Sequence, residues 1–200
     1  MDLFPSELMS EIEELNRNFI RSQGDSHGRA KLARGQGVFQ QASQFISKAR
    51  ENIAVLTYAE RPPAPSTFAE QIRDHLLEHD HISFEVVIAA NVRKAGRKFW
   101  AESDARFQIY EASGLEDRLI RWVLDTNVPT GFDVIIIDQK HVCLAFSPFP
   151  LSKQDTKHLA LFFENAGDFA RGLSLWFHAL KLAAKPYEIC RQRMGFRRHR

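Results

Sequence analysis

Between Val38 and Ala184 the chain alternates segments of helical periodicity with short apolar runs. Apolar residues recur every three or four positions over 37–52, 66–80 and 166–184, which predicts three amphipathic helices. The runs "IAVLTY" (53–58), "ISFEVVIAA" (82–90) and "HLALFFEN" (158–165) are short and rich in β-forming residues, as in buried strands. Helices that alternate with strands predict an α/β fold with a mixed sheet flanked by helices.

Two segments in the middle of the chain have weaker patterns. "RFQIYEA" (106–112) alternates apolar and polar residues and predicts a third strand. "SGLEDRLIRWVLDTN" (113–127) is apolar enough for a strand, but Ser113 and Glu116 match a capping box. We therefore predict a helix over 113–127.

A hairpin is predicted after these segments. "DVIIID" (133–138) and "HVCLAFSP" (141–148) are separated only by Gln139 and Lys140. This dipeptide lacks the glycine of the commonest two-residue turns, but the spacing still favours two antiparallel strands.

The termini differ from the centre. Apolar residues at helical spacing in 1–23 predict an N-terminal amphipathic helix, and the polar, glycine-spaced residues 24–37 predict a flexible linker. Residues 38–186 then form the predicted domain, and the basic residues 187–200 a tail beyond it.

Composition narrows the possible partners. The 27 basic and 25 acidic residues nearly cancel, so the net charge of +2 gives no overall signature of a nucleic-acid or membrane binder. No apolar run approaches the roughly 18 to 20 residues that span a bilayer, and the N-terminus lacks a signal peptide. Cys143 and Cys190 have neither metal-site spacing nor the density of a disulfide scaffold. We expect a soluble, cytoplasmic protein.

The order of elements over 38–184, together with the hairpin, resembles one repeat of the phospholipase D-like superfamily. In that superfamily a strand carries His-x-Lys-x-x-x-x-Asp and turns tightly into a second strand. The matching stretch here is "GFDVIIIDQKHVCLAFSP". With Asp138 at the aspartate position, the histidine position is Gly131 and the lysine position is Asp133. The resemblance implies a phospholipase D-like α/β sandwich, preceded here by the N-terminal helix.

These replacements bear directly on catalysis. The superfamily attacks a phosphodiester with an imidazole, and its lysine neutralises the phosphoryl oxygens. Glycine at 131 supplies no nucleophile. Asp133 would repel the phosphate, since two like charges ~4 Å apart cost about 1 kcal/mol in water and several at lower effective dielectric. We therefore expect a degenerate, non-catalytic repeat without a cofactor, and such repeats imply regulatory or ligand-sensing roles.

Few other side chains could replace the missing catalytic pair. Ser147 lacks the frame of a nucleophile elbow, and Cys143 alternates with apolar residues as a buried, inert thiol does. His141 and His158 lie near the hairpin and leave open a phosphodiesterase with a rebuilt site.

The stretch "HLLEHDH" contains three further histidines. His75 and His79 are four residues apart on one helical face and could hold zinc with His81 or Asp80 as a third ligand. The stretch lacks the order HExxH, and a polar helix end is the simpler explanation. We therefore predict no metal site.

Two basic segments could contact nucleic acid. The first follows the second strand, and ligands gather at strand ends in sheets of this class. It combines basic residues for phosphate contacts with an aromatic ring for stacking: Arg93, Lys94, Arg97, Lys98 and Trp100. The alternative is a solvated loop with one aromatic residue in the core. The second is the tail, whose arginines would find phosphates by counterion release: Arg191, Arg193, Arg197, Arg198 and Arg200. A solubilising end is the alternative there.

The resulting hypothesis is a non-catalytic phospholipase D-like module that binds DNA or RNA. A protein-interaction or inhibitor protein, acting through its N-terminal helix and the sheet edge, is the alternative from another class. The resemblance also implies a homodimer, because single-repeat members of the superfamily often pair.

Overall fold

The computed structural model describes residues 29–35, 37–58, 66–92, 97–126, 132–146 and 159–193. Its helices are α2 (Gly37–Ile46), α3 (Ser66–Glu78), α4 (Arg97–Glu111), the 3-10 turn η1 (Glu116–Arg118), α5 (Gly167–Ala183) and α6 (Tyr187–Arg193). Its strands are β1 (Arg29–Arg34), β2 (Asn52–Tyr58), β3 (Ser83–Ala90), β4 (Leu119–Asp125), β5 (Asp133–Ile137), β6 (His141–Phe146), β7 (Leu159–Glu164) and β8 (Lys185–Pro186).

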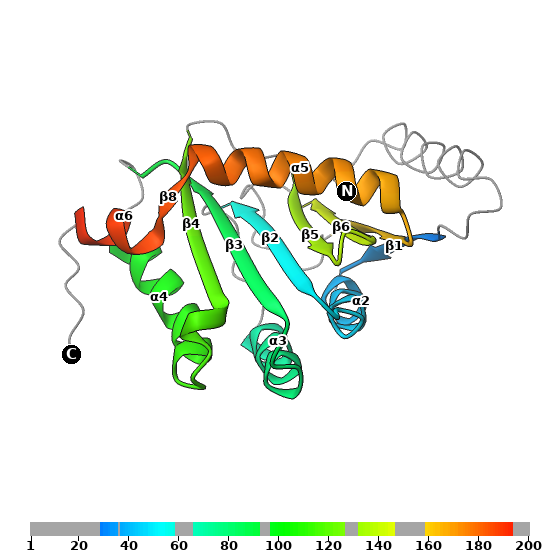
Figure 1. Cartoon of the computed structure of the whole chain (residues 1–200), viewed down its shortest axis with the longest axis horizontal. Coiled ribbons are helices and arrows are strands. Elements are labelled where there is room, and N and C mark those ends of the chain that lie inside the picture. The colour runs from blue at the N-terminus through cyan, green and yellow to red at the C-terminus, as the bar shows by residue number, and fades with distance from the viewer. Residues whose placement is uncertain are drawn as a thin grey trace.

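All eight strands form one mixed sheet in the order β1-β7-β6-β5-β2-β3-β4-β8 (Figure 1). The centre is parallel, because β2 pairs with β3 and β3 with β4 through helical crossovers. The strands β5, β6, β7 and β1 continue the sheet antiparallel on one side. This confirms the predicted α/β class with a mixed sheet.

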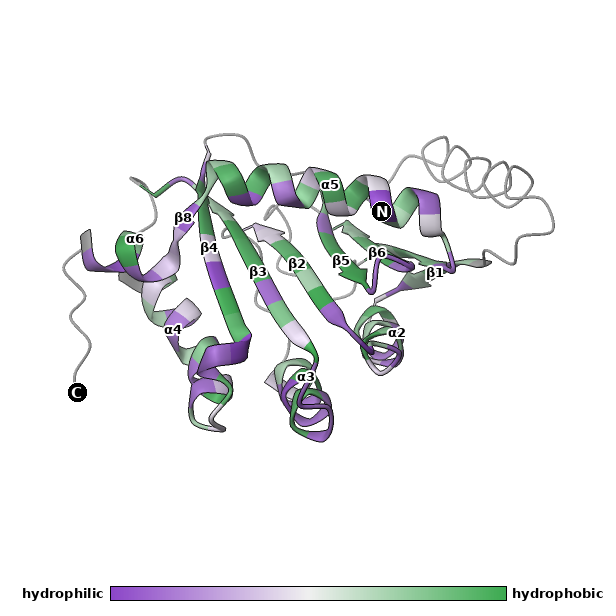
Figure 2. Ribbon diagram, viewed as in Figure 1, coloured by the Kyte–Doolittle hydropathy of each residue, from purple (hydrophilic) through white to green (hydrophobic). Residues whose placement is uncertain are grey.

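Helices cover both faces of the sheet. The long helix α5 crosses one face, and α2, α3 and α4 lie against the other (Figure 1). Alternate residues along β3 divide between the two cores: Phe84, Val86 and Ile88 face α2–α4, whereas Val87 and Ala89 face α5. Figure 2 shows that β2, β3 and β5 are largely hydrophobic and that the helices combine hydrophobic and hydrophilic residues. This burial on both faces explains why β3 is apolar without interruption from Val86 to Ala90.

Both predictions for the middle of the chain were wrong. Residues 106–112, predicted as a strand, mainly form the last turns of α4, in which Trp100, Phe107 and Tyr110 are buried. Residues 113–127, predicted as a helix, contain η1 and β4 instead. The reason lies at Gly114, whose φ of +72° ends α4 in the left-handed conformation that glycine adopts readily.

The ends of the described sheet also extend beyond the predicted domain. Residues 29–34, predicted as part of the flexible linker 24–37, form β1 and pair antiparallel with β7. Lys31 and Arg34 are exposed on this strand, and charged side chains are usual on a sheet edge. The predicted N-terminal helix over 1–23 lies outside the described residues.

The C-terminal segment 187–200 was predicted to be a tail outside the folded body. Its first part, Tyr187–Arg193, is instead the helix α6, and Tyr187 and Cys190 are buried in the core. Pro186 follows the end of the preceding helix, as predicted. It belongs to β8 and pairs with Trp122 of β4.

The predicted hairpin is present as β5 and β6. Its turn uses Asp138 and Gln139, with φ of +51° and +52°, one residue earlier than predicted. Two positive φ values define a type I′ turn, whose twist suits adjacent strands.

None of the helices in the described ranges has the length and apolar content needed to span a bilayer.

Candidate functional site

The carboxyl ends of the parallel strands lie together at one edge of the sheet. Tyr58 ends β2 beside Ala89, and Ala90 of β3 lies beside Asp125 of β4. The antiparallel strand β5 begins at the same edge, where the N–H group of Tyr58 donates a hydrogen bond to Asp133 Oδ1 at 3.1 Å. Ligands of α/β sheets gather at such an edge, so it is the first candidate site.

A cavity of about 400 Å³ extends from this edge between the sheet and α2, α3 and α4. Most of its wall is apolar, including the rings of Phe39, Phe68, Phe84, Phe99 and Phe107. Small-molecule sites are typically cavities of this kind with a few polar groups. Among the residues that the structure describes, the charged groups that line it are Glu102, Arg106 and Asp133.

Arg106 brings a positive charge into this cavity from α4. Burial lowers the pKa of the Arg106 guanidinium, and the negative charges of Glu102 and Asp133 act in the opposite direction. A cation therefore lies within electrostatic range of Asp133, although Asp133 occupies the lysine position of the resemblance. Arg106 was not among the predicted site residues, because this part of α4 was predicted to be a strand. The helical spacing of Ser103, Arg106 and Tyr110 was the available signal.

The cavity contains no replacement nucleophile of the histidine type. No imidazole belongs to its lining within the described residues. Cys143 does line it, but burial, followed by the charge of Asp133, raises the pKa of this thiol, so its reactive thiolate form is disfavoured. His158 and Ser147 lie outside the described residues.

The structure does not bring the degenerate motif together into one cleft. Asp133 and Asp138 flank β5 at opposite ends, roughly 17 Å apart at about 3.4 Å per residue. Asp138 is buried, and its carboxylate accepts hydrogen bonds from the backbone N–H groups of Arg50, Glu51 and Asn52 at 2.8–2.9 Å. Asp138 is therefore a structural residue of the far edge. Gly131 lies outside the described residues.

Trp100 cannot serve as the predicted stacking platform. Its side chain has an exposed fraction of 0%, and its ring packs against Phe99 and Tyr187. Trp100 projects from the second turn of α4 into the core because it shares the inward face with Phe107 and Tyr110. This prediction was wrong, and the alternative of an aromatic residue buried in the core applies to Trp100.

The other predicted nucleic-acid contacts are placed unequally. Arg97 and Lys98 belong to the first turn of α4, which follows the carboxyl end of β3, whereas Arg93 and Lys94 lie outside the described residues. Arg191 was predicted to be a free tail residue, but its Nε donates to both carboxylate oxygens of Asp104 at 2.8 and 2.9 Å. Arg193 ends α6. Arg197, Arg198 and Arg200 lie outside the described residues.

The histidines of the described ranges do not line the cavity. His141 begins β6 at the far edge, where its Nδ1 accepts the N–H group of Asn165 at 3.2 Å. His75 and His79 come together at the end of α3, with rings 4.6 Å apart. Neither group lines the cavity that contains Asp133.

Comparison with known proteins gives the fold. No protein-family model matches the chain, and no curated protein matches it. A solved structure of Nuc from Salmonella typhimurium, a phospholipase D family member, matches with a TM-score of 0.60 and 15% sequence identity, over 80% of this chain and 99% of Nuc. The chain has the phospholipase D-like fold.

Two further structures are similar to this phospholipase D-like chain. NucT from Helicobacter pylori has a TM-score of 0.53 and 14% identity, over 80% of this chain and 100% of NucT. TrmBL2, an archaeal chromatin protein with a novel mode of DNA binding, has a TM-score of 0.53 and 12% identity. That match covers 90% of this chain and 62% of TrmBL2. Identities this low carry the fold, which was predicted correctly, and nothing about chemistry.

Proposed function

We propose that this chain is a non-catalytic phospholipase D-like module that binds nucleic acid. The observation that carries the proposal is the position of Asp133, a carboxylate at the carboxyl edge, held by the N–H group of Tyr58. The superfamily's lysine neutralises phosphate at this position, and a carboxylate does the opposite. The charged groups that line the cavity within the described ranges are two acids and one base, a set that does not favour cleavage of a phosphodiester.

The binding part of the proposal rests on the basic segment after β3. Arg93, Lys94, Arg97 and Lys98 connect the carboxyl end of β3 with the first turn of α4. Phosphate contacts from such residues provide affinity without reading the base sequence. The fold is shared with TrmBL2, a chromatin protein that binds DNA, so the fold is compatible with a nucleic-acid partner.

The binding experiment compares the wild-type chain with a variant in which Arg93, Lys94, Arg97 and Lys98 are all changed to alanine. Fluorescence anisotropy with labelled single-stranded DNA, duplex DNA and RNA is measured over a range of salt concentrations. We expect weaker binding of the variant, and a decrease of about 0.7–0.9 in the slope of log affinity against log salt for each phosphate that the variant no longer neutralises. The exposed residues Lys140 and Arg171, changed together, provide the control. A wild-type chain that binds none of the three at low salt would overturn the proposal.

A separate assay tests the absence of catalysis. We expect hydrolysis of bis(p-nitrophenyl) phosphate and of labelled DNA at the rate of the protein-free blank, with and without Mg²⁺. Turnover that survives purification and disappears in Arg106→Ala would contradict the non-catalytic part and leave the binding part standing. Light scattering after size exclusion tests the homodimer implied by the resemblance, for which we expect twice the mass of one chain.

A second candidate function follows from the cavity itself. Its volume of about 400 Å³ and its apolar wall suit a small, mainly apolar ligand whose polar end meets Arg106 and Asp133. Ala69 lines the cavity from α3, and Ala69→Phe should fill part of it. We expect the fluorescent probe 8-anilinonaphthalene-1-sulfonate to bind the wild-type chain and to bind this variant less. Equal binding to both would remove the cavity from consideration.

A further inference from the structure

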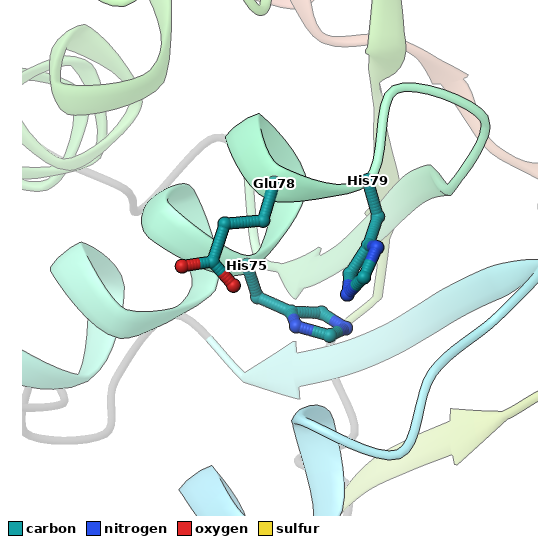
Figure 3. A group of neighbouring side chains, drawn as sticks. All are labelled: His75, Glu78 and His79. Carbon is teal, nitrogen blue, oxygen red and sulfur yellow. The ribbon is translucent and has the colours of Figure 1, made fainter.

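Three potential metal ligands lie together at the end of α3, away from the cavity. His75 and Glu78 lie in the last turn of α3 and His79 directly follows it, at positions i, i+3 and i+4, a spacing that brings side chains to one face of a helix. One ligand atom from each of the three lies within 4.8 Å of the other two. Figure 3 shows the two rings turned toward one another below the end of the helix, with the carboxylate beside the His75 ring.

The hydrogen bond of His75 prepares one of its nitrogens for a metal. Nε2 lies 3.2 Å from the carbonyl oxygen of Ala49, in the segment that leads into β2. Because a carbonyl oxygen can only accept, Nε2 carries the hydrogen and Nδ1 keeps its lone pair. A backbone carbonyl that binds the second ring nitrogen is the usual support of a metal-ligating histidine.

Arg118 fixes the backbone around the second histidine. Its guanidinium donates to the carbonyl oxygens of Leu76, His79 and Ile82, and so anchors the end of α3 and the turn that follows. The ligands therefore project from a positioned backbone. Glu78 is exposed and His79 is partly exposed, so both side chains can rotate toward a common ion. A tetrahedral zinc ion needs ligand atoms roughly 3.4 Å apart, given bonds of about 2.1 Å.

We propose that His75, Glu78 and His79 bind a divalent transition-metal ion, for which Zn²⁺ is the natural occupant. Two imidazole nitrogens and one carboxylate oxygen form a known zinc ligand set that leaves a fourth position for water. Mg²⁺ prefers oxygen ligands and should not compete. The sequence alone predicted no metal, and the zinc alternative used Asp80 or His81 as the third ligand. Glu78 takes that place here, and Asp80 and His81 lie against each other at 3.5 Å.

This site is independent of the proposed nucleic-acid function. The helix α3 ends at the edge of the sheet opposite Asp133, close to the segment that Asp138 holds. The bound ion would link three side chains at the end of α3. Through His75 it would also support the contact with Ala49. We expect bound Zn²⁺ to raise the thermal midpoint of the folded chain, because an ion that binds only the folded state stabilises it.

The test uses the full chain without a polyhistidine tag. Co²⁺ is titrated in as a probe, and its visible d–d bands report tetrahedral coordination. We expect one Co²⁺ per chain, displaced by one Zn²⁺ and not by Mg²⁺. Loss of a residue that only supports a metal ligand by a hydrogen bond weakens binding roughly 10- to 100-fold. Glu78→Gln and His79→Ala change the ligands themselves, so each should weaken Co²⁺ binding by more than that.

Controls separate these ligands from the other histidines of the chain. His81→Ala changes an exposed neighbour and should leave Co²⁺ binding and the Zn²⁺-induced rise in midpoint unchanged. His75 is buried, so Glu78→Gln and His79→Ala carry the test, and their metal-free circular dichroism and melting should match the wild type. A wild-type chain without tetrahedral Co²⁺ bands would overturn the proposal. Full binding by a chain that carries both Glu78→Gln and His79→Ala, or equal losses in His81→Ala and His79→Ala, would overturn the assigned ligands.

Discussion

The carboxylate of Asp138 accepts the N–H group of Asn52 at 2.9 Å and so joins the turn of the hairpin to the first residue of the central strand β2. The same carboxylate accepts the N–H groups of Arg50 and Glu51, which lie outside any helix or strand. Three backbone donors, two of them outside any regular element, are thereby satisfied. Asp138 thus links the hairpin turn to the segment that leads into β2.

Replacing Asp138 should destabilise the fold without affecting ligand binding at the opposite edge. Asp138→Ala leaves three N–H groups without their acceptor, and we expect a loss of about 3 kcal/mol or more in the free energy of unfolding. Asp138→Asn keeps one acceptor oxygen and tolerates the positive φ, so we expect a smaller loss of about 1–2 kcal/mol. Urea denaturation measures both. Equal losses would show that the hydrogen bonds do not determine the effect.

Trp100 provides a test of burial against nucleic-acid stacking. Its indole N–H is buried without a hydrogen-bond partner in the described part of the chain. Trp100→Phe removes this unpaired donor at the cost of some volume, so we expect a change within about 1.5 kcal/mol. Trp100→Ala should cost about 3–5 kcal/mol through the cavity it leaves. Calorimetry measures both. A Trp100→Phe chain with wild-type stability and clearly weaker nucleic-acid binding would contradict the buried assignment.

The sequence predicted most of the fold because period and apolar content agree in most elements. The strands β2, β3, β5, β6 and β7 and the helices α2, α3 and α5 follow their patterns, as local and tertiary preferences coincide there. At 106–112 the local pattern and the tertiary packing conflict. The alternation of Phe107 and Ile109 with polar neighbours suggests a strand, but the wider spacing from Trp100 to Tyr110 follows the helix. A window starting at Arg97 would have shown it.

The candidate site was predictable only in part. The edge of the sheet followed from the strand order, and Asp133 followed from the motif. Arg106 was not predicted, because it lies in the part of α4 that was predicted to be a strand. The partnership of Arg191 with Asp104 joins residues 87 positions apart, and no local pattern encodes such a contact. The same holds for Ala49 and His75, which prepare the proposed metal site.

His141 should make the stability depend on pH. Burial and the charge of Lys48 lower its pKa, and opposing effects of Glu164 and Asp138 do not cancel this, so the folded state favours the neutral ring. The unfolded chain binds a proton near pH 6.5 and the folded chain at lower pH. Stability is therefore complete above about pH 6.5 and falls below it, by at most about 1.4 kcal/mol per pH unit for one proton.

The variant His141→Asn tests this dependence. Its side-chain oxygen can take the place of Nδ1 as acceptor for the N–H group of Asn165, and it does not titrate in this range. We expect the free energy of unfolding to fall less steeply between pH 6.5 and 5 in His141→Asn than in the wild type. The residual slope includes His75, whose pKa burial also lowers. Parallel curves for the two chains would assign the dependence to other groups.

Arg191 and the residues after Arg193 should separate stability from binding. The Arg191 guanidinium pairs with Asp104, which also accepts the hydroxyl group of Tyr187 at 3.0 Å, and both ionic side chains are mostly buried. Arg191→Ala leaves Asp104 with less compensation, so we expect a loss of about 1–2 kcal/mol in the free energy of unfolding.

Removal of residues 194–200 takes away three arginines beyond α6. That deletion should leave the thermal midpoint unchanged and reduce the salt dependence of nucleic-acid binding by up to about 0.9 for each phosphate that these arginines neutralise. Differential scanning calorimetry and anisotropy on the same preparations distinguish the two roles, and a lowered midpoint in the deletion would place the tail within the folded body.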